Sequence, residues 1–323
     1  MSVLTEVRSP QRTRTRWWIL AVLCLSLFMV VVDNTIVNVA LPTLSEELSA
    51  TTANLQWIVD AYTLVFSALL LAFGYFGDRT GRRRALQFGL VIFAITSGLA
   101  ALSQTTEQLI GARALMGIGA AMIFPATLAI IINVFTDIRE RAMAIGIWSG
   151  VTGLAVAAGP VTGGLLLEHF WWGSIFLVNI PIALVALLAG RLLIPDSRDP
   201  RPGGLDRLGM VLSIAAVAAV VWAVIEAPHR GWTSAEIVIT GTTGLLLLAA
   251  FVVHELRTRY PLLDVSLFRN PRFSAASVAI ASAFFGLFGF IFLITQYMQL
   301  VQGYSPLQAG LRTVPFAVVT GVF

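Results

Sequence analysis

Ten stretches of predominantly apolar residues constrain this chain more than any other feature. A transmembrane helix needs about 20 such residues to cross the hydrocarbon core of a bilayer. The stretches lie at residues 17–40, 55–77, 84–104, 108–132, 141–166, 172–194, 208–226, 236–255, 273–298 and 306–323. Charged residues make up 12% of the chain, whereas a soluble domain has about 25%. The sequence therefore predicts an all-α integral membrane protein with ten spanning helices.

The arginines indicate how these spans are oriented. All 21 basic residues are arginine, and they gather at the N-terminus and in every second loop. The opposite side has only Arg230 and Arg312, and Arg113 lies inside a span. Basic loops stay in the cytoplasm, so we expect a cytoplasmic N-terminus. The positive charge is then explained by topology, and no nucleic-acid partner is expected.

Asp33 lies in the first span, in the segment Val-Val-Val-Asp-Asn-Thr-Ile-Val-Asn. A carboxylate in mid-membrane costs roughly 2.5–3.5 kcal/mol, so it indicates a partner or a function. Desolvation favours the neutral carboxyl group, which makes Asp33 a candidate proton carrier. The same charge could hold a cationic substrate. The alternative is a packing role, with hydrogen bonds to Asn34, Asn38 or a neighbouring helix.

Two more charged residues lie within apolar spans. Asp60 falls near the outer end of the second span, where Trp57 and Tyr62 could form an aromatic wall for a flat cation. The alternative for these aromatics is an interfacial belt. Arg113 lies in the fourth span, where a carboxylate partner would couple protonation to helix position, whereas snorkelling to the outer surface is the structural alternative.

The fifth span is crowded with small residues, several of them four apart on one helix face. Small residues allow close helix approach, and Pro160 removes a backbone hydrogen bond and permits a kink. This composition favours a close, bendable interface between moving helices. A general glycine enrichment of membrane helices is the alternative.

Four segments, among them the short arginine-rich turn Gly-Tyr-Phe-Gly-Asp-Arg-Thr-Gly-Arg-Arg-Arg at 74–84, resemble motifs of the drug:proton antiporters of the major facilitator superfamily, in their fourteen-helix branch. They are a first-helix motif at 33–42, a cytoplasmic-loop motif at 74–84, a fourth-helix motif at 113–119 and an antiporter motif at 153–164. The segment 296–310, with Gln296, Tyr297 and Gln299, is similar to the ninth and tenth helices of that branch.

The resemblance implies two six-helix bundles that work by alternating access. It places a cytoplasmic tail at 1–16, the first bundle at 17–194, a proline- and glycine-rich linker at 195–207, an extra helix pair at 208–255 and the start of the second bundle at 256–323. The last span stops at Phe323 without a basic loop, so we expect a chain truncated after its tenth helix.

The resemblance also implies roles for individual residues. Coupling of protons to substrate would rest on Asp33, Asp60 and Arg113. The predicted substrate cavity contains Asn34, Asn38, Gln56, Trp57, Tyr62, Gln296, Tyr297 and Gln299. The predicted gating loop, a charge lock for the outward-facing state, contains Gly74, Asp78, Arg79, Gly81, Arg82 and Arg83. The alternative for this loop is a topology signal with no gating role. The antiporter motif contains Gly153, Gly159, Pro160, Gly163 and Gly164.

The predicted function is proton-coupled export of drugs or antibiotics across the bacterial inner membrane, by a monomer that uses the proton motive force and no cofactor. Asp60 makes the chain similar to the members of that branch that export lipophilic cations, so the resemblance favours such substrates, although residues 315–323 lack the further acid that such exporters can carry. The alternatives are an exporter of a dedicated neutral or anionic metabolite, with Arg113 as a ligand, and a non-transporting fragment or sensor. An enzyme is not expected, because no aqueous segment holds paired carboxylates, a nucleophile with its base or a phosphate loop. No metal site is expected from Cys24 and three scattered histidines.

Overall fold

Helices make up every regular element of the described chain. The computed structural model describes residues 10–198, 206–305, 307–313 and 315. The long helices are α1 (Pro10–Glu47), α2 (Thr52–Thr80), α3 (Arg82–Ala101), α4 (Thr106–Val134), α5 (Ile138–His169), α8 (Arg207–Arg230), α9 (Ala235–Glu255) and α10 (Pro271–Gln296). The shorter elements are α6 (Ser174–Leu177), α7 (Asn179–Leu193), the 3₁₀ helix η1 (Val265–Arg269) and the π-helical turn η2 (Tyr297–Val301). The all-α prediction is confirmed for these residues.

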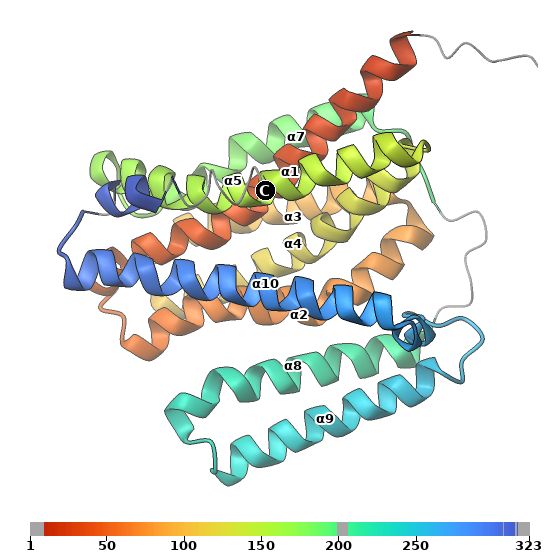
Figure 1. The fold of residues 1–323 in the computed structure, drawn as a ribbon. Coiled ribbons are helices and arrows are strands. Elements are labelled where there is room, and N and C mark those ends of the chain that lie inside the picture. The colour runs from red at the N-terminus through yellow and green to blue at the C-terminus, as the bar shows by residue number, and fades with distance from the viewer. Residues whose placement is uncertain (1–9, 199–205, 306, 314, 316–323) are drawn as a thin grey trace, which may run out of the picture.

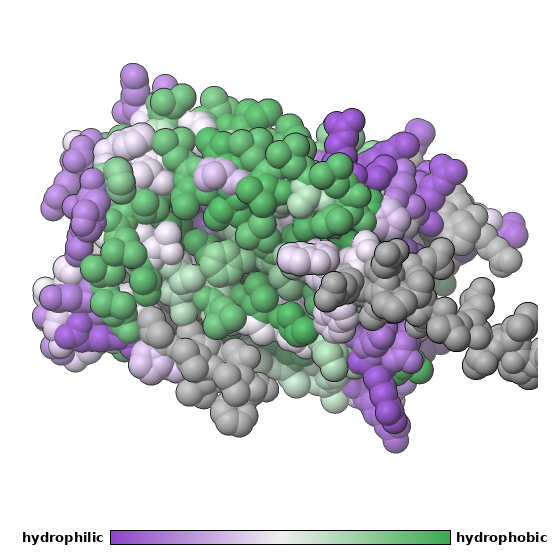
Figure 2. Space-filling view, turned by 90° about the horizontal axis from the view of Figure 1, so that it is seen from above, coloured by the Kyte–Doolittle hydropathy of each residue, from purple (hydrophilic) through white to green (hydrophobic). Residues whose placement is uncertain are grey.

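Eight helical segments of the described chain are long and apolar enough to cross a membrane. Each coincides with one of the first eight predicted spans, and the sixth is made of α6 and α7 together. Figure 2 shows a broad central region of apolar side chains, with polar side chains gathered at the two ends of the molecule. This distribution matches a protein that exposes its middle to lipid and its ends to water.

The ninth and tenth predicted spans have a different outcome. The ninth lies over α10, of which Pro271–Leu287 forms a shorter apolar helix. Most of the tenth, 306–323, lies outside the described residues. The count of ten spans and the division into bundles therefore stay predictions.

Side chains with short polar groups determine where the helices begin. Thr51, Thr105, Asp137 and Ser234 each accept a hydrogen bond from a backbone N–H of the adjoining first helical turn. Such caps satisfy donors that a helix leaves unpaired at its N-terminus. The break between α6 and α7 has another cause: Pro181 has no N–H to donate to the carbonyl of Leu177, four residues earlier.

The first helix lies at the centre of the packing. Most of α1 is buried, and it contacts α4, α5 and α7. The helices α3 and α4 pack together, and α2 packs against α4. The pair α8–α9 lies along one edge of the molecule, where α8 packs against α2 (Figure 1).

The arginine-rich connections lie at one end of the molecule. The start of α1, the start of α8 and the 3₁₀ helix η1 all lie at the right-hand end in Figure 1. At that end, Arg16 of α1 forms an ion pair with Glu140 of α5, with 2.7 Å between Nη1 and Oε2. The common location is what the positive-inside pattern predicted for these loops.

The small residues of α5 allow it to lie directly on α1. Gly153, Gly159, Pro160, Gly163 and Gly164 are all buried. A Cβ atom added at Gly159 would overlap the side chain of Thr35, and one added at Gly163 would lie 2.8 Å from Cγ1 of Ile36. The antiporter motif therefore forms the surface on which the middle of the first helix rests.

This close contact predicts a large effect of one methyl group. Gly159→Ala should destabilise the protein by about 1–3 kcal/mol, because α1 and α5 must move apart. Gly146→Ala is the matched control, because no heavy atom lies within 4 Å of a Cβ at that position of the same helix. Thermal unfolding of the purified protein in detergent would measure both changes. Equal midpoints for the two variants would contradict the tight α1–α5 contact.

Candidate functional site

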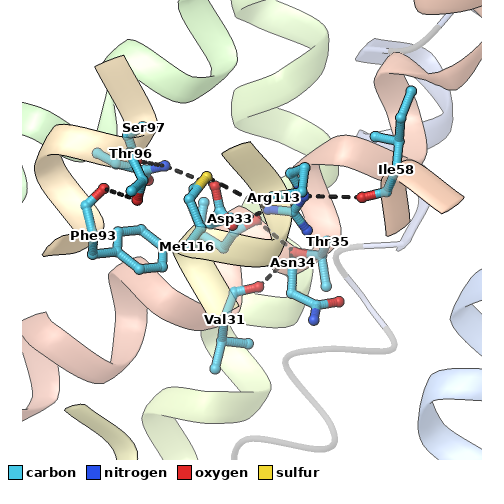
Figure 3. A network of polar contacts seen from close by, with 12 residues as sticks. Val31, Asp33, Asn34, Thr35, Ile58, Phe93, Thr96, Ser97, Arg113 and Met116 are labelled. Atoms are coloured by element: carbon cyan, nitrogen blue, oxygen red, sulfur yellow. Dashed lines mark hydrogen bonds and ion pairs between the residues drawn. The ribbon is translucent and has the colours of Figure 1, made fainter. Parts of the chain in front are cut away.

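A buried ion pair lies at the centre of the helix bundle. Arg113 of α4 and Asp33 of α1 are both fully buried, with 2.6 Å between Nη1 and Oδ2 (Figure 3). The two residues are 80 positions apart in the sequence. In a medium of low dielectric constant, an unpaired charge would be far more costly than this pair. The contact therefore gives each charge the partner that its position in an apolar span required.

Arg113 also binds α2. Its Nε donates a hydrogen bond to the backbone carbonyl of Ile58, with 3.1 Å between the atoms (Figure 3). Its guanidinium carbon lies 4.4 Å from the centre of the Tyr62 ring, in a cation–π contact. The one side chain thus connects α4 to both α1 and α2.

Asn179 is a member of this network that was not predicted from the sequence. Its Nδ2 donates hydrogen bonds to Oδ1 of Asp33 over 2.7 Å and to Oγ of Ser97 over 3.3 Å. Asn179 is fully buried at the first position of α7, directly after the helix break. An amide two residues before a proline, in an otherwise apolar span, was the available signal. Asp33 is therefore held from α4 by a cation and from α7 by an amide.

A separate cavity of about 600 Å³ opens between α1, α2, α10 and η2. Its lining consists of Asn38, Leu41, Pro42, Ser45, Thr52, Leu55, Gln56, Val59, Asp60, Gln296 and Gln299. Among these described residues Asp60 supplies the only carboxylate, and Asn38, Gln56, Gln296 and Gln299 supply amides. The volume lies within the range of about 300–1,000 Å³ that small-molecule pockets have.

The helix α2 presents different faces to the ion pair and to the cavity. Ile58 and Tyr62 are one turn apart and contact Arg113, whereas Gln56 and Asp60, also one turn apart, line the cavity. A residue of an α-helix is turned by about 100° from its neighbour, so Ile58 and Asp60 point about 160° apart. One rigid helix therefore connects the two sites.

Four residues that were predicted to form the substrate cavity do not line the observed cavity at Asp60. Tyr62 contacts Arg113, and Trp57 donates its indole N–H to Oε1 of Glu226 on α8 over 2.8 Å. The backbone carbonyl of Asn34 accepts a hydrogen bond from Asn38, and the exposed Tyr297 hydroxyl accepts one from Gln302. Trp57 and Tyr62 thus do not lie together as one aromatic wall.

The predicted gating loop is bound to the segment directly after α7. Asp78 pairs with Arg82 over 2.6 Å, and Arg83 and Arg84 lie 3.9 and 3.6 Å from the carboxylate of Asp196. Gly81 has a φ of +123°, which favours glycine over any other residue.

Two further residues of the predicted loop lie in or at the end of α2. A Cβ on Gly74 would contact Pro125 of α4 at 3.5 Å, and Arg79 is exposed at the end of α2. Within the described ranges, no group of three or more histidine, cysteine, aspartate or glutamate side chains is arranged to hold a metal ion.

A family model described as Major Facilitator Superfamily matches residues 23–323. Multidrug efflux pump LfrA of Mycolicibacterium smegmatis is 46% identical over 313 residues, which are 97% of this chain and 62% of that protein. Methyl viologen resistance protein SmvA of Salmonella typhimurium is 39% identical over 95% of this chain and 62% of its own length. Multidrug resistance protein Stp of Mycobacterium tuberculosis is 35% identical over 96% of this chain and 58% of its own length. The chain thus spans about three fifths of the length of these curated relatives.

The fold is also similar to that of a solved transporter. A crystal structure of the peptide transporter POT in complex with sulfate matches 90% of this chain and 64% of its own chain, with a TM-score of 0.62 and 18% sequence identity. At this identity the match establishes the fold alone.

The ion pair predicts a strongly non-additive pair of substitutions. Asp33→Leu leaves Arg113 buried without its carboxylate and should cost about 3–5 kcal/mol of stability, whereas Asp33→Leu combined with Arg113→Leu should recover much of that loss. Thermal unfolding in detergent would measure both, together with the single variant Arg113→Leu. Asp196→Leu is the control, because its partners are partly exposed and such pairs contribute about 0–1 kcal/mol. A double variant as unstable as the sum of its single variants would show that the two residues are not coupled.

Proposed function

The chain belongs to the Major Facilitator Superfamily, and on this premise we propose that the protein exports drug-like organic cations in exchange for protons. It is a multi-pass membrane protein, and its relatives are named as multidrug efflux or resistance proteins. The observation that carries the proposal is the pairing of a buried Asp33–Arg113 site with an acidic cavity on the other face of α2. The first site suits a proton, and the second suits a cation.

Asp33 is the proposed proton-binding residue. Its carboxylate is held by Arg113 and Asn179, in a place with no exposed surface. When Asp33 takes up a proton, the charge that holds Arg113 is removed. The guanidinium then no longer fixes α1 relative to α4, so binding of a proton would release one arrangement of these helices and favour another.

Asp60 is the proposed counter-charge for the substrate. The cavity that contains it is lined by apolar residues on α1 and α2 and by four amides. Apolar walls with few polar groups and one charge are typical of sites that bind organic ligands. A cation that binds in this cavity would lose its hydration shell and contact the carboxylate and the amides instead.

The link between the sites lies in α2. Arg113 binds this helix at Ile58 and Tyr62, so a change in the Arg113 contact bears on the helix that holds Asp60. In an alternating-access cycle, a proton would enter at Asp33 as the cation leaves Asp60. If more than one charge enters per charge that leaves, each net charge contributes about 2.3 kcal/mol per 100 mV of membrane potential.

The remaining assignments follow from this proposal. The arginine-rich end of the molecule faces the cytoplasm of a bacterial inner membrane, by the positive-inside rule. The ion pairs of the loop at Asp78–Arg84 with Asp196 act as the charge lock of one state. The protein acts as a monomer and needs no cofactor.

An exporter of an anionic metabolite is the second candidate. It would use Arg113 as a substrate ligand. The position of this arginine argues against that role, because it is fully buried against Asp33, outside the lining of the cavity. A neutral product remains compatible with the cavity, and transport of chloramphenicol-like neutral drugs without that of cations would favour it.

The proton-binding role predicts the loss of active export in Asp33→Asn. The amide keeps a hydrogen-bond acceptor for Arg113 but takes up no proton, so efflux of ethidium against its gradient should stop. Efflux would be followed by fluorescence in cells that produce the full-length protein, with and without a protonophore. Arg16→Gln, at the far end of α1, is the control for expression and insertion. Protonophore-sensitive efflux by Asp33→Asn at the wild-type rate would remove Asp33 from the mechanism.

The cation-binding role predicts a selective loss of affinity in Asp60→Asn. The variant loses the charge and keeps the volume of the side chain, so binding of ethidium should weaken by about tenfold or more, the equivalent of about 1.4 kcal/mol. Fluorescence titration of the purified protein would measure this. A neutral drug of similar size should bind both forms equally. An equal affinity of the two forms for ethidium would assign the cation to another acid.

A further inference from the structure

The outer ends of α8 and α2 are joined by polar contacts. Trp57 donates its indole N–H to Oε1 of Glu226, and the two atoms lie 2.8 Å apart. Nε2 of His229 lies 2.5 Å from Oε1 of Gln56, and the nitrogen donates because a carbonyl oxygen only accepts. Two consecutive residues of α2 are therefore held by residues three positions apart on α8.

Glu226 fixes the position of this junction. Its side chain is 8% exposed, and its second oxygen accepts from Nε of Arg230 over 2.5 Å. Arg230 in turn pairs with Glu236 of α9 over 2.6 Å. A buried carboxylate with both oxygens bonded has one favoured orientation, since any other leaves a charge unpaired. The helix pair α8–α9 thus holds the start of α2 at a defined angle.

Gln56 brings this junction to the cavity. It lines the cavity one turn before Asp60, and side chains four positions apart are neighbours on one face of a helix. Because His229 binds the oxygen of the amide, the NH₂ group is the part left to bind a neighbouring acceptor, and Asp60 is the carboxylate one turn away. The orientation of the Gln56 amide therefore determines how much of the Asp60 carboxylate is free for a ligand.

We propose that His229 is a specificity-determining positioning residue, which acts through Gln56 to select among the organic cations that the Asp60 cavity binds, while the bond of Glu226 to Trp57 holds α8 beside α2. The inference rests on the proposed function. It assigns to the helix pair α8–α9 a share in substrate recognition, although the described lining of the cavity includes no residue of either helix. Without His229, the Gln56 amide can turn its oxygen into the cavity, where it accepts hydrogen bonds from a cation that has N–H groups.

Two probes separate this effect from a general loss of binding. Ethidium carries two amino groups that donate hydrogen bonds, and tetraphenylphosphonium carries none. In the purified full-length protein, His229→Ala should shift the ratio of the two dissociation constants in favour of ethidium by about fivefold, the size of one hydrogen bond. His229 is exposed, so the substitution leaves the fold intact. Glu140→Gln is the control, because it removes an interhelical ion pair at the opposite end of the bundle and should leave the ratio unchanged.

A second variant tests whether His229 acts through Gln56. In a Gln56→Ala background, His229→Ala should cause no further change in the ratio, since the group that it positions is absent. A shift of the same size in both backgrounds, or no shift in either, would overturn the inference while wild-type binding of both probes still supports the proposed function. Wild-type protein that binds neither probe would contradict the proposed function itself.

Discussion

A charge inside a membrane protein must have a partner, and the arrangement of this bundle follows from the way that Arg113 finds its partners. The guanidinium binds the carboxylate of Asp33 on α1, the carbonyl of Ile58 on α2 and the ring of Tyr62. Because the ion pair has no exposed surface, loss of either partner leaves the other charge buried without its counter-charge. The pair therefore fixes how three helices lie against each other. On the proposed function, their arrangement would also respond to a single proton, since only Asp33 among these groups changes charge readily.

The helix α2 turns this sensitivity into a link between two sites. Its inner face is held at Ile58 and Tyr62, and its other faces line the cavity at Asp60 and bind α8 at Trp57. A helix is stiff over such a short distance, so displacement of one face displaces the others. The close contact of Gly159 with α1 links α5 to the ion pair in a similar way. It leaves little freedom for Asp33 to move unless α5 moves with it.

Much of this architecture could be predicted from the sequence, because membrane spans depend on local composition. The first eight apolar stretches coincide with helices, and the sequence required partners for Asp33 and Arg113. It did not pair them with each other, because the contact depends on how α1 and α4 are rotated in the bundle. Asn179 was missed because an amide carries no charge. The separation of Trp57 and Tyr62 could have been predicted, since five residues turn a helix by about 140°.

The position of α8–α9 relative to α2 follows the same physical rule as the ion pair. Apolar side chains give little preference for one helix neighbour over lipid, because both environments are equally apolar. Polar contacts favour a helix neighbour over lipid, because lipid tails form no hydrogen bonds. The junction between α8 and α2 is built from the bonds of Trp57 to Glu226, Glu226 to Arg230 and Gln56 to His229. Polar groups that only fasten a helix pair could lie anywhere along α2. Gln56 lies one turn from Asp60 in the lining of the cavity, so on the proposed inference the contacts that hold the pair in place would also orient a group of the substrate site.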